Sequence, residues 1–180
     1  MSEYYTMKIA GLERHLEKFP VSDKLDIAAF IIFGDVELTI AGCEALRKKL
    51  PEFDVIITPE AKSIPIAYEM ARQTGKPYII ARKGMKVYMR NPLEVDVTSI
   101  TTKNEQHLFL GESETALLKD KRVLIIDDVI STGESLAAVR KLVEEAGGKE
   151  AAACAFLAEG DAADRKDIIF LEKLPLFFKD

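Results

Sequence analysis

The sequence lacks the features of a membrane-spanning segment and of a secretory signal. It contains no apolar run of the roughly 18 residues that a bilayer span requires. Its first residues, Met1 to Tyr5, do not show the basic-then-apolar order of a secretory signal. We therefore expect a cytoplasmic protein that makes no membrane contact.

Cysteine, histidine and net positive charge are also scarce. The 180 residues include two cysteines and two histidines, without a CxxC pair, so neither a disulfide framework nor a zinc site is expected. The net charge of −5 disfavours non-specific binding to nucleic acid, which depends on a basic field. An anionic ligand would instead require a local basic patch.

What the sequence does contain is typical of one folded domain. Hydrophobic residues make up 48% and charged residues 31%, as in ordinary globular proteins. No repeat and no linker rich in Pro, Gly or Ser divides the chain. We expect a single domain over residues 1–180, in which residues 1–34 form strands and turns of a small hood or appendage.

Strands and helices are predicted to alternate after residue 34. A helix that begins after Asp35 and stops at Pro51 is predicted, because apolar residues recur at spacings of three and four. The apolar face expected to pack on the sheet contains Val36, Ile40, Cys43, Leu46 and Leu50. Such alternation indicates an α/β fold, with a mostly parallel sheet flanked by helices and ligands beyond the carboxyl ends of the strands. Buried strands are predicted at 55–57, 78–81, 123–126, 152–157 and 168–171.

A long section separates the second and third of these strands. Residues 95–101 and 107–110 alternate in polarity like the two strands of a hairpin, with turn residues between them. Long connections of this kind usually have a function. We predict a flexible β flap in this section.

The densest pattern in the chain runs from Val123 to Ser135, VLIIDDVISTGES. A buried strand leads to Asp127 and Asp128, which would repel a phosphate but can accept hydrogen bonds from the vicinal hydroxyls of a sugar. The following residues open a helix whose free N–H groups can wrap a phosphate, and Gly133 permits close approach. The predicted phosphate ligands are Ser131, Thr132, Gly133, Glu134 and Ser135.

The alternative without a functional role is that Asp127 and Asp128 are solvated loop residues beside a helix cap. The complete string of thirteen residues disfavours that interpretation. It resembles the phosphoribosyl pyrophosphate signature of the type I phosphoribosyltransferases, and residues 54–172 are similar in order and spacing to adenine phosphoribosyltransferases and related purine enzymes. The resemblance predicts the fold of that family.

The resemblance implies an enzyme that transfers the 5-phosphoribosyl group from phosphoribosyl pyrophosphate to adenine, hypoxanthine, guanine or xanthine. Asp127 and Asp128 would be the catalytic residues, holding the ribose hydroxyls, and Val129 would lie against the base. Magnesium is the expected cofactor, because pyrophosphate carries more charge than a few lysines can offset. The protein ligands of the ion are left unassigned.

Two further segments resemble the family. Residues 58–63 match its pyrophosphate loop, and residues 81–86 match a basic element that in relatives often reaches the site of a neighbouring subunit, which implies a homodimer. As plain sequence, the same lysines could be solvated surface residues. The predicted pyrophosphate ligands are Glu60, Ala61, Lys62, Arg82, Lys83 and Lys86.

Some positions depart from the family pattern and leave the base open. Thr102 and Lys103 stand in the flap where adenine enzymes carry an acid and a tyrosine. Glu159 falls where a base or magnesium contact would lie, and we predict a base contact, although an acidic solvated turn fits equally well. His15 and His107 are expected to be structural.

Two other functions are less favoured by the sequence than phosphoribosyl transfer. A non-catalytic sensor of phosphoribosyl pyrophosphate with the same fold is the main alternative, although no DNA-binding helix pair or basic tail is evident. A P-loop nucleotide hydrolase is disfavoured, because neither GxxxxGK[ST] nor GxGxxG occurs in the sequence.

Overall fold

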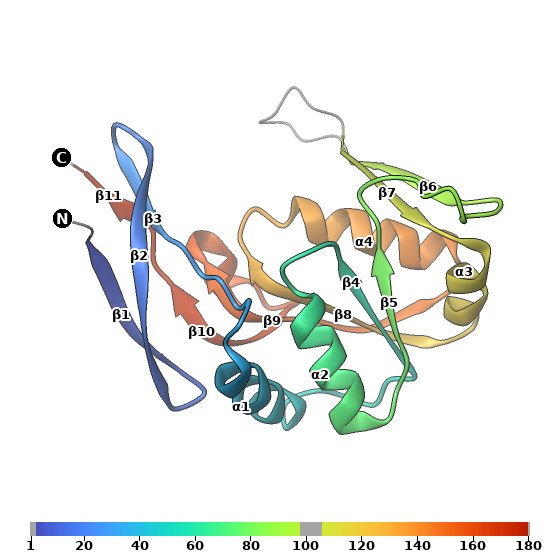
Figure 1. Ribbon diagram of the computed structural model, residues 1–180, viewed down its shortest axis with the longest axis horizontal. Coiled ribbons are helices and arrows are strands. Elements are labelled where there is room, and N and C mark those ends of the chain that lie inside the picture. Colours follow the sequence, from blue (N-terminus) through green and yellow to red (C-terminus); the bar gives the residue numbers. More distant parts are fainter. Residues whose placement is uncertain (1–2, 98–105, 180) are drawn as a thin grey trace.

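A parallel sheet of five strands forms the centre of the molecule. The computed structural model describes residues 3–97 and 106–179, and its central strands lie in the order β10-β9-β8-β4-β5 (Figure 1). All neighbours in this sheet run parallel. The predicted α/β fold is therefore confirmed. The strands are β4 (Val55–Pro59), β5 (Tyr78–Ala81), β8 (Arg122–Ile130), β9 (Lys149–Glu159) and β10 (Ile169–Leu174).

The sheet is covered on both faces, which explains why its strands read as continuous apolar runs. In β8, Val123 and Ile125 enter one hydrophobic core, whereas Leu124 and Ile126 enter the other. Helices α1 (Val36–Arg47) and α2 (Ile64–Thr74) cover one face, and α4 (Glu134–Glu145) covers the opposite face (Figure 1). Within the described ranges, no helix has both the length and the apolar character to cross a membrane.

A separate hairpin stands beside α4, where the flap was predicted. Its strands β6 (Leu93–Val97) and β7 (Gln106–Leu110) pair antiparallel, and Phe109 also bridges Arg82 at the end of β5. Val95 and Leu108 are buried in the core shared with α4. The described part of the hairpin is thus packed into the domain, and Thr102 and Lys103 lie outside the described residues.

The two ends of the chain form a small antiparallel sheet. Its strands are β1 (Tyr4–Ile9), β2 (Leu12–Ser22), β3 (Leu25–Ala28) and β11 (Phe177–Phe178), and they stand at one end of the molecule beside β10 (Figure 1). Ile9 and Leu16 are buried in the core that also contains Leu38 of α1. The predicted strands and turns of residues 1–34 are present, but the contribution of β11 was not predicted.

Helix α1 differs from its predicted form in length and orientation. Asp35 caps it as predicted, accepting from the backbone N–H of Leu38, but the helix ends at Arg47. Val36 and Ile40 were expected to face the core, yet 67% and 42% of their surfaces are exposed. The buried face instead contains Leu38, Thr39, Gly42, Cys43 and Leu46. The short helix α3 (Glu112–Leu118) was not predicted.

Gly42 explains this orientation, because it lets the backbone of α1 lie directly on the buried ring of Phe156 in β9. A Cβ at Gly42 would overlap that ring, with Cε1 of Phe156 at 3.0 Å. We predict that Gly42→Ala lowers the free energy of unfolding by about 1–3 kcal/mol through overpacking. Helix propensity alone would predict a gain of about 1 kcal/mol, so the sign of the change is informative.

Chemical denaturation measures this change. Gly84→Ala is the matched control, because a Cβ at Gly84 meets nothing within 4 Å. Adding Phe156→Leu to Gly42→Ala should recover part of the loss. A stabilised Gly42→Ala variant would contradict the packing described here.

Candidate active site

The candidate site lies where the order of the strands in the central sheet reverses. After β4 the chain adds β5 on one side, and after β8 it adds β9 and β10 on the other. β4 and β8 pair in register from Val55 and Val123 to Ile57 and Ile125, whereas β8 remains paired with β9 as far as Ile130. Beyond the paired residues the two strand ends flank a crevice, the usual ligand site of such sheets.

The crevice contains a cleft of about 200 Å³ formed by three segments of the chain. The segments are the turn after β4, the residue two places beyond β5, and the end of β8 with the start of α4. Pro59 and Ser63 were not among the predicted site residues, and all the others were. The lining residues are Pro59, Glu60, Ala61, Lys62, Ser63, Lys83, Asp127, Asp128, Val129 and Ser135.

Asp127 and Asp128 lie on β8 itself and not in the turn after it. The sequence placed the end of this strand at Ile126, but the strand continues to Ile130 because β9 pairs with it. Both carboxylates line the cleft, and they lie close enough for the charge of Asp128 to raise the pKa of Asp127. Asp128 is only 7% exposed, and its Oδ2 has no hydrogen-bond partner among the described residues.

The two acids form a site in which one buried oxygen has no hydrogen-bond partner among the described residues. Buried acceptors normally have a hydrogen-bond partner, so Asp128 Oδ2 fits a hydroxyl donor or a hard cation from a ligand. Burial, followed by repulsion from Asp128, raises the pKa of Asp127 well above its usual range. The Asp128 N–H donates to Asp127 Oδ1 over 2.9 Å and offsets part of this effect.

The turn between β8 and α4 lies at the surface of the protein. Ser131 and Thr132 are exposed, and Gly133 adopts a left-handed conformation with φ of +85° immediately before the helix. Glycine adopts that conformation without steric cost. Together with Glu134, these residues lie outside the lined cleft but continue the chain between Val129 and Ser135, which line it.

Glu60 lines the cleft, and its carboxylate is already paired within the protein. Its carboxylate accepts from the Lys83 N–H over 3.0 Å and from Arg82 Nη1 over 3.1 Å, and these contacts lower its pKa. Its own N–H donates to the Ala81 carbonyl. Glu60 therefore joins the turn after β4 to the basic segment after β5, leaving Ala61 and Lys62 exposed toward the solvent.

The remaining predicted residues surround the cleft. Arg82 also donates to the Tyr88 hydroxyl over 3.2 Å, and Lys86 lies close enough to Glu60 to contribute to its lowered pKa. Glu159 ends β9, where partial burial raises its pKa and the charge of Lys62 opposes that rise. The fold thus brings Glu159, at the end of β9, near Lys62, in the turn after β4.

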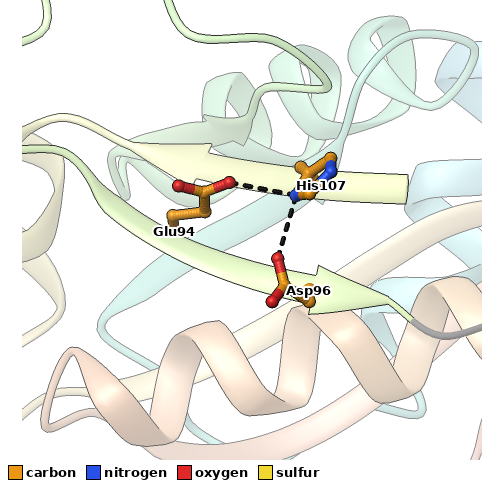
Figure 2. A group of neighbouring side chains, drawn as sticks. All are labelled: Glu94, Asp96 and His107. Atoms are coloured by element: carbon orange, nitrogen blue, oxygen red, sulfur yellow. Dashed lines mark hydrogen bonds and ion pairs between the residues drawn. The ribbon is translucent and has the colours of Figure 1, made fainter. Parts of the chain in front are cut away.

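Both histidines lie in cross-strand pairs away from this cleft. His107 Nδ1 is 2.9 Å from Asp96, which is directly opposite it in the hairpin, and 3.0 Å from Glu94 (Figure 2). The three side chains could offer ligands to a metal, but both carboxylates are exposed and the contacts already join β6 to β7. His15 similarly contacts Thr6 over 2.7 Å.

Comparison with known proteins agrees with this geometry. The sequence model of the phosphoribosyl transferase domain family matches residues 38–176 of this chain. Adenine phosphoribosyltransferase of Thermosipho africanus is 34% identical over 77% of this chain and 84% of that protein. Hypoxanthine/guanine phosphoribosyltransferase of Methanococcus voltae is 36% identical over 81% of this chain and 72% of that protein.

A solved structure shares the fold. The crystal structure of adenine phosphoribosyltransferase from Thermoanaerobacter pseudethanolicus superimposes with a TM-score of 0.73 at 24% identity, over 88% of this chain and 95% of that one. The chain therefore belongs to the phosphoribosyltransferase family. Within it, the relatives place the chain in the purine branch of the type I enzymes.

The raised pKa of Asp127 predicts how stability depends on pH. The unfolded state releases this proton near pH 4, whereas the folded state retains it to higher pH, so ionisation costs stability as the pH rises. Asp127→Asn removes this cost. We predict that it raises the free energy of unfolding by about 1–3 kcal/mol at pH 8.5 and much less at pH 4.5.

Urea denaturation at the two pH values measures the difference. Asp23→Asn, in the exposed turn between β2 and β3, serves as the control. An Asp127→Asn effect that is the same at both pH values would show that the acid pair does not oppose folding.

Proposed function

We propose that this protein transfers the 5-phosphoribosyl group from phosphoribosyl pyrophosphate to a purine base, releasing pyrophosphate. The observation that carries the proposal is the meeting of Asp127 and Asp128 with the turn after β4 and the start of α4 in one cleft. The relatives named as adenine and hypoxanthine/guanine phosphoribosyltransferases support the same reaction.

Each part of the substrate has a matching group of residues. The ribose hydroxyls would donate to Asp127 and Asp128, including the unpartnered Oδ2 of Asp128. The 5-phosphate would take the N–H and hydroxyl groups of residues 131–135, at the positive end of α4. Pyrophosphate would lie toward Ala61, Lys62, Arg82, Lys83 and Lys86, and the base toward Val129 and Glu159.

The reaction would be a displacement at the anomeric carbon. The bond from that carbon to pyrophosphate breaks with its electron pair leaving on pyrophosphate, and a base nitrogen forms the new bond as it loses its proton. The ribose passes through an oxocarbenium-like state. The contribution of the protein is to hold the reactants in line and to stabilise the developing charges.

Magnesium fits the acidic side of this site. Hard oxygen ligands favour the ion, and the buried, unpartnered Oδ2 of Asp128 is an oxygen of that kind. Asp127 and Asp128 are the residues that would hold it, directly or through the ribose hydroxyls. When bound, the ion would neutralise charge on the pyrophosphate.

A panel of bases tests the proposal. We expect pyrophosphate release from phosphoribosyl pyrophosphate and magnesium with at least one of adenine, hypoxanthine, guanine and xanthine. Asp127→Asn with Asp128→Asn should lower the rate at least 100-fold, because the ribose loses both acceptors, while circular dichroism shows an unchanged fold.

The same assay separates the alternatives. Thermal stabilisation by phosphoribosyl pyrophosphate without release for any base would favour the non-catalytic sensor. Near-normal turnover of the double variant would contradict the role of the two acids.

We also propose a homodimer, which the resemblance of residues 81–86 implies. Support comes from an exposed apolar face where α1 and α2 meet. There Val36, Ile40 and Tyr68 are 67%, 42% and 57% exposed, and they line a groove of about 400 Å³. Contiguous apolar surface of this kind marks interaction sites, and a second copy would cover it.

Ile40→Glu with Tyr68→Glu should therefore shift the protein from dimer to monomer, because two charges would have to be buried in the interface. Light scattering after size-exclusion chromatography measures the mass. Leu117→Glu, on the exposed side of α3, is the control and should leave the dimer intact. A dimeric double variant would exclude this face, and a monomeric wild type would exclude the homodimer.

A further inference from the structure

The proposed 5-phosphate site has a charge problem. Residues 127–135 contain the carboxylates of Asp127, Asp128 and Glu134 but no lysine or arginine. A phosphate carrying up to two negative charges would therefore approach a segment that is itself acidic. Backbone N–H groups offset part of the repulsion, but a nearby cation would offset far more.

Arg165 supplies a cation at this position. It follows the short 3-10 helix η1 (Gly160–Asp164), which continues from the carboxyl end of β9. A Cβ added to Gly133 would overlap Arg165 Nη1 and lie 3.5 Å from its Cζ, so the guanidinium rests directly against the turn. The side chain is 29% exposed and remains accessible to a ligand.

The orientation of Arg165 is fixed from the side opposite the turn. Its Nε and Nη2 donate to the two oxygens of Asp167 over 2.9 and 2.7 Å. Asp167 also accepts from Arg140 of α4 over 2.7 Å. Arg140 is itself held by both oxygens of Glu150 in β9.

This network leaves one end of the guanidinium for another partner. Nη1 has no hydrogen bond within the part of the chain that the structure describes, and it is the nitrogen nearest Gly133. Bidentate pairing with a carboxylate holds an arginine rigidly. Little side-chain entropy would therefore be lost when Nη1 meets an anion.

We propose that Arg165 is a direct ligand of the 5-phosphate, through Nη1, and so completes the site formed by residues 131–135. This inference rests on the proposed function, because it takes the turn before α4 to be the phosphate site. Gly133 then has two roles: it adopts the left-handed conformation, and it leaves the space in which the guanidinium reaches the turn.

Calorimetry with two separate ligands tests the role. Ribose 5-phosphate probes the turn, and pyrophosphate with magnesium probes the other end of the cleft. Arg165→Gln should weaken ribose 5-phosphate binding by about tenfold to a hundredfold, as expected for a lost charge-assisted hydrogen bond. Pyrophosphate binding should change less than about twofold, because that ligand lies away from the turn.

Two further variants separate binding from folding. Arg165→Lys retains the charge but loses the fork that pairs with Asp167, and its affinity for ribose 5-phosphate should fall between those of wild type and Arg165→Gln. Arg47→Gln, on the exposed end of α1, removes a charge far from the site and should bind both ligands like wild type.

The outcomes distinguish this inference from the proposed function. Wild-type affinity of Arg165→Gln for ribose 5-phosphate would overturn the inference alone. Equal weakening of both ligands would also overturn it, since that result indicates general disruption. A wild-type protein that binds pyrophosphate but not ribose 5-phosphate would overturn the proposed function as well.

Discussion

The separation of β4 from β8 beyond Ile57 and Ile125 is the constraint on which the rest of this structure depends. A parallel sheet that adds strands outward in both directions leaves one crevice at its carboxyl edge. Loops that lie far apart in the sequence meet there, including the turn after β4 and the start of α4. The chemistry of the site follows from what those loops present to one another.

These loops present charged groups that are not fully paired within the protein itself. Asp127 and Asp128 occupy adjacent positions on a buried strand, and one carboxylate oxygen has no partner among the described residues. On the other side of the crevice, Glu60 holds Arg82 and the backbone of Lys83 in place. A ligand with hydroxyl donors at one end and anionic groups at the others would satisfy both sides. We expect this arrangement to reduce stability, because burial disfavours the ionised carboxylate of Asp127.

Much of the fold was readable from the sequence, because its signals are local. Asp35 marked the start of α1, and the alternation of strands and helices along the chain predicted the parallel sheet. The family is confirmed, whereas the residue roles within the site stay predictions. The predicted end of the strand at Ile126 was wrong, because pairing with β9 extends β8 to Ile130. Ile40 was wrongly expected to face the core, because Gly42 is the residue of α1 that lies against Phe156. Arg165 could not be found this way, since only the folded chain brings it to Gly133.

The central claim is that the turn before α4 holds a phosphorylated ribose. A crystal structure of the protein with ribose 5-phosphate and magnesium tests it most directly. The account predicts the phosphate at the N–H groups of residues 131–135 and the ribose hydroxyls at Asp127 and Asp128. Ribose 5-phosphate bound elsewhere, with this turn empty at saturating concentration, would contradict it.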